Sequence, residues 1–422
     1  MKTGRILSGI MIGAMLNAWC FSPAPAGGFQ ASGFSARATG MGSVLVAMPG
    51  EPTAMYTNPA ALAFLGGTHL SLGTTVSLPD YQFIGVSPSQ SSSKMKTQVL
   101  FPPNACLTHT FPTGVGIGIA ATIPYSVKTD WGEEWVGNRI VTSSDLRTSQ
   151  ITPAVALRIG KHWSLGIGLQ VVFLRLDLNR RFGEISTPES PLPTVFMTGS
   201  ADVAYGFEVG TMYCPNDVFT FGLSLKSRIR SMIEDGTVTY SGVPMESSTS
   251  VYPNSTFSTS VTHPDQVRGG LSIRPIPELL ISGEANLVRW STFKNMVVRI
   301  GSPQYEQRIE QNGWKDVVAL RAGVELCLSE ITLRGGISYE PSPVPDAELR
   351  PSMPDADRLV YAAGIGYAVE EGLMLDLGVQ FMGHRLRTVT DSQVQFAPGS
   401  YFNGTYDLAS TVVGLNISYS WK

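Results

Sequence analysis

The sequence predicts an all-β fold, a transmembrane antiparallel β-barrel of about fourteen strands with an N-terminal plug inside its lumen. Three observations support this prediction. Stretches with an apolar residue at every second position recur along residues 67–422, long polar loops alternate with tight turns between them, and an export signal precedes them. An up-and-down barrel places its tight turns on one side of the membrane and its long loops on the other.

The alternation is clearest near the C-terminus. Between 413 and 421 the odd positions are apolar and the even positions are small or polar, and 318–326 and 373–381 repeat the pattern. Segments of about ten residues cross a bilayer when they are tilted. A soluble sandwich alternates as well, so the prediction depends on the recurrence over many strands.

The even number of predicted strands fits closure of a single-chain antiparallel barrel. With about 4.8 Å between strands and about 40° of tilt, the cylinder is roughly 28 Å across, too wide for wall side chains to fill. A closed lumen therefore requires an inserted segment. The predicted strands span 68–78, 97–109, 114–124, 148–160, 163–178, 201–213, 218–230, 265–274, 278–290, 315–328, 330–340, 357–369, 372–385 and 409–421.

The first residues have the pattern of a secretory signal peptide. Lys2 and Arg5 precede an apolar run over 6–19, and Ala24-Pro25-Ala26 is a small-x-small cleavage site. We predict a signal peptide over 1–26. No second apolar run has the length of a membrane helix, so export ends in the periplasm, the outer membrane or outside the cell. The barrel pattern favours the bacterial outer membrane.

Residues 27–66 are rich in glycine and alanine and lack sustained alternation. A segment too irregular for a lipid-facing wall can still lie inside a lumen where its backbone is satisfied, so we predict a plug over 27–66 and a barrel over 67–422. The alternative is a disordered periplasmic tail. Within the plug, Asn58-Pro59-Ala60 is either a switch that couples ligand capture to movement or a helix-shaping turn.

Composition excludes several function classes. The net charge of −3, with 15% charged residues, argues against a nucleic-acid binder. The three cysteines after the predicted signal peptide imply no disulfide framework, and the five histidines lack zinc-ligand spacing. There is no G-x-S-x-G motif. We therefore expect no catalytic residue, no metal and no cofactor, and a protein that is not an enzyme.

Several motifs occur in order along the chain. They are Gly28-Phe29-Gln30, Asn58-Pro59-Ala60, 114–116, Pro124-Tyr125, Trp131, 163–168, Trp314-Lys315-Asp316, 333–337, 342–345 and 354–358. Together they resemble the FadL family of outer-membrane transporters of long-chain fatty acids and other hydrophobic compounds, and the resemblance covers nearly the whole chain after the predicted signal peptide. The chain departs from the family in its Trp421-Lys422 end and in a short 179–200 loop.

The resemblance implies passive uptake of a long-chain fatty acid or similar hydrophobic molecule. The outer loops capture it, an apolar lumen pocket holds it, and a kinked third strand releases it sideways into the membrane. About fifteen methylenes removed from water contribute on the order of 12 kcal/mol, so a route that avoids water preserves this gain. The expected partners are outer-membrane lipid, lipopolysaccharide and the barrel assembly machinery, with the protein a monomer.

The candidate site residues are chosen to match these roles. A carboxylate ligand needs a cation, and the resemblance places Arg180 or Arg181, and Arg308, in that role, although loop arginines are often simply solvated. An apolar run in the 179–200 loop is the candidate for capture or for packing between loops. It consists of Leu192, Val195, Phe196 and Met197.

Pro124 lacks a ladder N–H and so predicts a kink late in the third strand, or simply its end. The resemblance assigns the lateral opening to Pro124, Tyr125 and Ser126. Two other functions remain open: a general diffusion porin for small solutes, and a barrel that serves a secretion system without transport. A porin would lack a plug and would conduct a large steady ion current.

Overall fold

The computed structural model describes residues 27–31, 33–86, 91–183, 192–243, 252–301, 308–311, 313–397 and 399–421. The predicted signal peptide, residues 1–26, lies outside the described residues.

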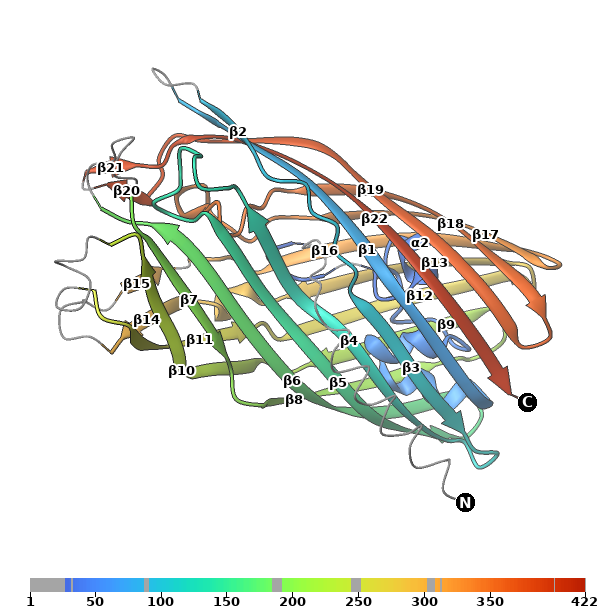
Figure 1. Ribbon diagram of the computed structural model, residues 1–422. Coiled ribbons are helices and arrows are strands. Elements are labelled where there is room, and N and C mark those ends of the chain that lie inside the picture. Colours follow the sequence, from blue (N-terminus) through green and yellow to red (C-terminus); the bar gives the residue numbers. More distant parts are fainter. Residues whose placement is uncertain are drawn as a thin grey trace.

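The described strands form a closed antiparallel barrel (Figure 1). Fourteen of them succeed one another around the wall, which confirms the predicted fold class. The wall consists of β1 (Gly67–Gly85), β3 (Pro103–Thr110), β4 (Val115–Asp130), β5 (Ser143–Ile159), β6 (Trp163–Arg181), β8 (Ala204–Tyr213), β9 (Phe219–Lys226), β12 (Gln266–Ile276), β13 (Leu279–Val288), β16 (Val317–Leu328), β17 (Ile331–Glu340), β18 (Arg358–Glu370), β19 (Leu373–Val389) and β22 (Gly404–Trp421).

Pairing between the first and last strands closes the wall. The β1–β22 ladder runs without interruption from Thr68 opposite Trp421 to Gly85 opposite Gly404. A closed barrel leaves no sheet edge in the bilayer, where an unpaired N–H or C=O has no water to bind.

The long connections carry further strands that the sequence interpretation treated as loops. β1 runs to Gly85 and β4 to Asp130, so the loop starts predicted at 79 and 125 are wrong. The β1–β22 and β4–β5 ladders continue beyond the apolar band, and there the strand residues no longer alternate between hydrophobic and polar. The added strands are β2 (Ser92–Lys94), β7 (Thr194–Ser200), β10 (Ile229–Ser241), β11 (Ser255–His263), β14 (Asn295–Ile300), β15 (Arg308–Gln311), β20 (Gln395–Ala397) and β21 (Ser400–Tyr401).

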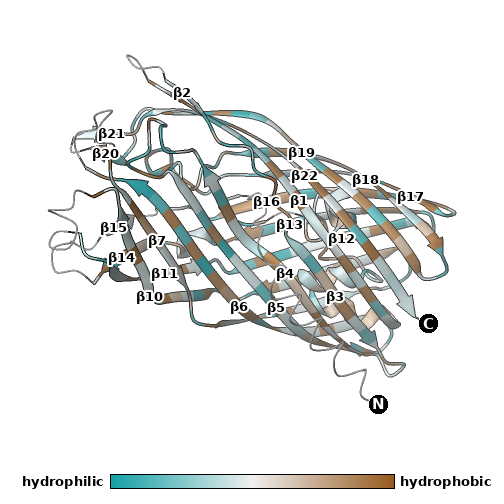
Figure 2. Cartoon of the chain, in the orientation of Figure 1, coloured by the Kyte–Doolittle hydropathy of each residue, from teal (hydrophilic) through white to brown (hydrophobic). Residues whose placement is uncertain are grey.

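Hydrophobic and hydrophilic residues alternate along the strands of the wall (Figure 2), and many of the large hydrophobic side chains are exposed, as in a lipid-facing wall. On β6, Leu165, Ile167 and Leu169 are exposed, whereas the residues between them are buried. Exposed aromatic side chains lie near both ends of the band, as in the girdles of outer-membrane barrels. Trp163 stacks on Tyr213 near the tight turns, with ring centroids 4.3 Å apart. No helix among the described residues has the length and hydropathy needed to span a bilayer.

Three short helices after the N-terminus lie inside the ring of strands (Figure 1). They are α2 (Ala36–Gly40), η1 (Pro52–Tyr56) and η2 (Pro59–Phe64). Wall side chains bind backbone donors of the segment that carries these helices: the Leu45 and Val46 N–H groups, between α2 and η1, each donate to Glu284 Oε2 at 3.0 Å. The Ala36 N–H donates to Asn416 Oδ1 at 2.7 Å. The irregular segment is therefore stable in the lumen because wall side chains satisfy its backbone.

A chain of buried ion pairs also holds the lumen segment. Arg37 of α2 pairs with Glu51 and with Glu325 of β16, and Glu325 also binds Arg334 Nε at 2.8 Å. Arg334 Nη1 continues the chain to Asp376 Oδ1 at 2.6 Å. Burial alone lowers the pKa of Arg37, but Glu325 and Glu51 raise the pKa above its usual value, so the guanidinium stays charged. Breaking such a buried pair costs about 3–5 kcal/mol.

Glycines on the inner face give the lumen segment its space. A Cβ at Gly336 would lie 2.4 Å from the Gly42 nitrogen, whereas a Cβ at the adjacent Gly335 would approach nothing closer than 3.6 Å, at Val324 Cγ1. Alternation along β17 places Gly336 toward the lumen and Gly335 toward the membrane.

We expect Gly336→Leu to displace the lumen segment and open a steady ion current through the barrel. Gly335→Leu is the matched control and should leave the barrel closed. Planar-bilayer recordings measure the current, and heat-modifiable migration on a gel verifies that both barrels fold. Equal currents from the two folded variants would show that residues 33–66 do not close the lumen.

Candidate functional site

Phe29 lies inside the lumen in a cage of aromatic rings. Its side chain is 0% exposed. The cage draws on distant parts of the chain, namely β4, β11, η3 (Trp290–Thr292) and the segments directly after η3 and before β16. Edge-on ring pairs of this kind stabilise a core beyond their buried area. The ring-centroid distances from Phe29 are 5.8 Å to Tyr125, 6.3 Å to His263, 4.8 Å to Trp290, 5.3 Å to Phe293 and 6.0 Å to Trp314.

Gly28 is suited to its place beneath the indole rings. Its φ is +66°, and a Cβ would lie 2.7 Å from the Trp290 ring and 2.9 Å from that of Trp314. Its N–H donates to Asp355 Oδ2 at 3.0 Å. Only glycine fits this conformation and this space without strain.

The segment that carries Phe29 pairs with β4 as a short strand. The Ala31 N–H donates to the Pro124 carbonyl at 2.9 Å, and the Ser126 N–H donates to the Phe29 carbonyl at 2.8 Å. Gln30 lies opposite Tyr125 in this bridge. The N-terminal residues therefore occupy the position next to β4 that a neighbouring wall strand would otherwise fill.

The wall is interrupted at this position. The β3–β4 ladder extends only from Thr110–Gly116 to Ala105–Ala121, and β3 begins at Pro103, directly after Pro102. The β4–β5 register shifts between Thr122 and Tyr125, around Pro124. Prolines lack the ladder donor and break pairing, so no wall strand pairs with this edge of β4, which binds residues 29–31 instead. A crevice at the break is lined in part by Ala31, Pro102 and Ile123.

A group of buried charges lies directly beside the cage. Arg268 Nη1 is 3.5 Å from Glu208 Oε1, and both residues are nearly fully buried. Lys226 Nζ is 5.5 Å from the centre of the Tyr125 ring and donates to Gln150 Oε1 at 3.4 Å. Among the described residues, no carboxylate oxygen lies within 4.0 Å of the Lys226 ammonium. The cluster thus has two cations for one carboxylate.

Two of the four predicted apolar residues belong to the same apolar cluster as Phe29. Leu192 is buried, and Val195 and Met197 belong to the continuous cluster that contains the cage. The prediction that positions 195–197 lie in a loop is wrong, because they lie in β7, which pairs with β6 and β10. Phe196 is half-buried.

The predicted arginines belong to β6 and β15, which contribute no ring to the cage. Arg181 ends β6 and pairs with two loop carboxylates, Glu133 at 2.7 Å and Glu134 at 3.2 Å. Arg180 lies opposite Val195 in the β6–β7 ladder. Arg308 begins β15, where its backbone lies opposite Val298. Their role in binding a head group stays a prediction.

Asn58, Pro59 and Ala60 fasten the lumen segment to the wall. The Asn58 side chain caps η2 by accepting from the Ala60 N–H at 3.1 Å, and it donates to the Val46 and Thr211 carbonyls at 2.8 Å and 3.1 Å. A Cβ at Gly166 of β6 would lie 2.4 Å from the Ala60 nitrogen. The motif touches β6 and β8, and its role as a switch stays a prediction.

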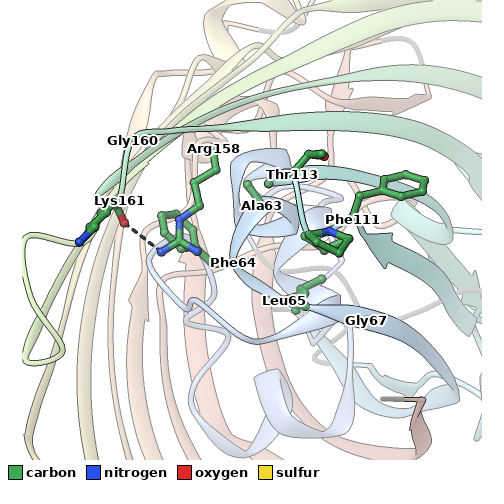
Figure 3. Close-up of a pocket in the computed structure, with 13 residues that line it drawn as sticks. Ala63, Phe64, Leu65, Gly67, Phe111, Thr113, Arg158, Gly160 and Lys161 are labelled. Atoms are coloured by element: carbon green, nitrogen blue, oxygen red, sulfur yellow. Dashed lines mark hydrogen bonds between the residues drawn. The ribbon is translucent and has the colours of Figure 1, made fainter.

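A second hollow opens at the end with the tight turns (Figure 3). It measures ≈ 660 Å³ and lies between the end of η2 and the turns at 111–114 and 160–161. Arg158 covers the Phe64 ring at 4.8 Å and donates to the Lys161 carbonyl at 2.9 Å. This cation–π contact attaches the end of the lumen segment to the β5–β6 turn.

A protein-family model described as "Outer membrane protein transport protein (OMPP1/FadL/TodX)" matches residues 18–421. The chain belongs to this family. The FadL-family match spans both the lumen segment and the whole wall of the barrel.

Two relatives are similar to this chain along most of their length. The long-chain fatty acid transport protein of Escherichia coli K12 is 23% identical over 408 residues, which covers 87% of this chain and 90% of that protein. Outer membrane protein P1 of Haemophilus influenzae is 21% identical over 374 residues, covering 80% of each.

Solved structures share the fold at low identity. The chain superposes on a Pseudomonas aeruginosa FadL homologue with a TM-score of 0.82 and 17% identity, covering 94% of this chain and 100% of that one. The P. putida toluene transporter TodX gives a TM-score of 0.74 and 15% identity, with 92% and 99% covered. The FadL-family chain is an outer-membrane β-barrel, and its family consists of transport channels for hydrophobic molecules and not of enzymes.

The sequence interpretation missed Lys226, Arg268 and Glu208. A signal was present, because alternation places each of them on the lumen face of a strand whose other face is apolar. A charge on the inner face of a FadL-family strand must be paired, hydrated or bound to a ligand.

We expect Phe29→Ala to leave a void bounded by aromatic rings that binds a small apolar probe. Toluene should then quench the fluorescence of Trp290 and Trp314 saturably, because an apolar cavity stays dry and accepts such ligands. Phe34→Ala is the control, since Phe34 lies in the lumen segment beside Tyr56, outside the cage. Identical titrations of wild type and Phe29→Ala would show that Phe29 does not fill a ligand-sized space.

Proposed function

We propose that this protein carries long-chain fatty acids, or similar hydrophobic molecules with an acidic head, passively across the outer membrane. Residues 27–66 act as the plug, residues 67–422 form the channel, and residues 1–26 are the removed signal peptide. The cargo occupies the apolar cluster that holds Phe29 and leaves sideways between β3 and β4. The observation that carries this proposal is the double role of residues 29–31, which fill the cage and also seal the break in the wall.

These two roles couple binding to release. An apolar chain that enters the cage competes with the Phe29 ring for the same space. Because the Phe29 carbonyl and the Ala31 N–H bind β4, displacing the ring pulls the short strand from the Pro124–Ser126 edge. Pro124, Tyr125 and Ser126 then border an opening toward the lipid. The cargo needs no aqueous passage, so it keeps a transfer gain of about 0.8 kcal/mol per methylene.

The buried charges support an acidic cargo. Lys226 and Arg268 have one carboxylate between them within the part of the chain that the structure describes. A carboxylate that arrives beside Tyr125 completes the pairing of this cluster in a low-dielectric site, where a charge-assisted hydrogen bond is strong. Hydrocarbon cargo lacks this contact.

Capture uses the apolar surface above the cage. Val195 and Met197 of β7 belong to the cluster, and Leu192, just before β7, is also buried. We assign to this surface, together with Phe196, the first contact with the cargo. The filled lumen supports a carrier over a diffusion porin, which needs an open water path. The predicted partners, namely lipopolysaccharide, the barrel assembly machinery and no second copy of the chain, belong to this proposal.

Lys226→Met should weaken binding of a long-chain fatty acid by roughly tenfold or more, because one charge-assisted hydrogen bond is lost. Binding of the alcohol with the same chain length should change little. Displacement of a fluorescent ligand from the purified protein measures both. Arg308→Ala tests the alternative head-group site predicted from the sequence. If Lys226→Met affects acid and alcohol equally, the cluster does not bind the head group.

A reversible cross-link tests lateral release. In a variant whose three native cysteines are replaced, Gln30→Cys and Tyr125→Cys face each other in an antiparallel bridge, a spacing that a disulfide can span. We expect the oxidised protein to lose fatty-acid uptake by cells and a reductant to restore it. The control is Thr68→Cys with His109→Cys, opposite residues of the β1–β3 ladder away from the break. Full uptake by the oxidised 30–125 protein would refute lateral release.

A further inference from the structure

A concave site lined by charged, aromatic and aliphatic residues lies on the outer rim of the barrel, away from the cage. It measures ≈ 480 Å³ and lies where β17, β18 and β19 meet the connection between β17 and β18. Tyr339, Asp357, Arg385, Leu386 and Arg387 are among its lining residues.

A bulge in β19 creates the site. The β19–β22 register shifts between Met382 and Arg385, and the β18–β19 ladder ends at Val360 opposite Met382. Above that point, the edge of β19 that faces β18 has no strand partner among the described residues. Directly after the bulge, Arg385 and Leu386 lie opposite Leu408 and Asp407 of β22, and both line the site.

The acidic residues of the site already have partners. Asp357 accepts from the Tyr339 hydroxyl at 3.3 Å and from the Ser342 N–H at 2.8 Å. Asp346 of η4 (Asp346–Glu348) accepts from Arg387 Nε at 2.7 Å. Arg387 is further bound to the Ser342 hydroxyl and the Asp355 carbonyl, at 2.9 Å and 3.0 Å.

Arg385 is the cation without such a partner. Within the described ranges, no carboxylate oxygen lies within 4.0 Å of its guanidinium, and the residue is exposed. Its neighbour Leu386 is 71% exposed, the highest value for a large hydrophobic side chain in the part of the chain that the structure describes. The Arg385 guanidinium and the exposed Leu386 side chain together suit a ligand that has an anionic group next to an apolar chain.

The level of the site in the membrane identifies the ligand. Tyr361 and Phe381 lie opposite each other in the ladder just below the bulge, and both are more than half exposed, at 55% and 52%. Exposed aromatics at this end of the wall mark the outer boundary of the apolar band. Arg385 therefore lies at the height of the headgroups of the outer leaflet.

We propose that this site binds the phosphorylated, multiply acylated sugar lipid of the outer leaflet. Arg385 binds a phosphate bidentately, and Leu386 with the Tyr339 ring contacts the first part of an acyl chain. The phosphate comes from the membrane lipid and not from solution, because the apolar contacts recognise the chain attached to it. The proposal rests on the outer-membrane location of the protein and is independent of its cargo.

Native mass spectrometry of the detergent-solubilised protein tests the site. The probe is a hexa-acylated glucosamine disaccharide with two phosphates, titrated against wild type, Arg385→Ala, Arg385→Lys and Arg175→Ala. Arg175 is an exposed arginine that already pairs with Asp177 at 2.9 Å, so it is the matched control. Heat-modifiable migration verifies the fold of each variant.

We expect Arg385→Ala to weaken the tightest lipid binding roughly tenfold, Arg385→Lys to retain most of it, and Arg175→Ala to leave it unchanged. The dephosphorylated lipid should bind wild type as weakly as the phosphorylated lipid binds Arg385→Ala. Millimolar inorganic phosphate should not displace the lipid. Equal binding by wild type and Arg385→Ala, equal binding of the two lipids, or displacement by inorganic phosphate would each overturn the proposal.

Discussion

The backbone pairing of residues 29–31 with β4 is the contact on which the arrangement of the upper lumen depends. A β-barrel in a bilayer must bond every backbone group of its wall, and here β3 stops too early to serve β4. The N-terminal segment supplies the missing partner at Pro124 and Ser126. Because the same segment carries Phe29, the closure of the wall and the filling of the cage depend on one set of hydrogen bonds.

The features that arise from local periodicity were predictable from the sequence. Strand alternation predicted the wall. The absence of alternation over 27–66 led to the prediction of a plug, and the short helices of this stretch lie inside the ring of strands (Figure 1). Pro124 marked the irregularity in β4, since a missing N–H is a property of the residue itself. The strands inside the long connections were not predicted, because β7, β10 and β11 lie beyond the apolar band, where alternation loses its hydrophobic signal.

The site itself depends on contacts between distant residues. Arg181 was a reasonable candidate for a head group, but Glu133 and Glu134 from the preceding loop bind it. Lys226 and Arg268 come from strands separated by a long connection, so their proximity to Tyr125 arises only in the closed barrel. Periodicity orients a side chain toward the lumen, yet only the three-dimensional order of the strands determines which groups it contacts there.

The contacts of α2 have a consequence for biogenesis. Arg37 and Ala36 are bound by Glu325 and Asn416, which lie in strands synthesised near the end of the chain. The α2 segment is thus exported early, but it can bind its partners in the wall only after β16 and β22 have been exported as well. A product truncated before β22 would lose the strand that closes the wall against β1 and also the Asn416 side chain that binds the Ala36 N–H, so the wall and the lumen segment would fail together.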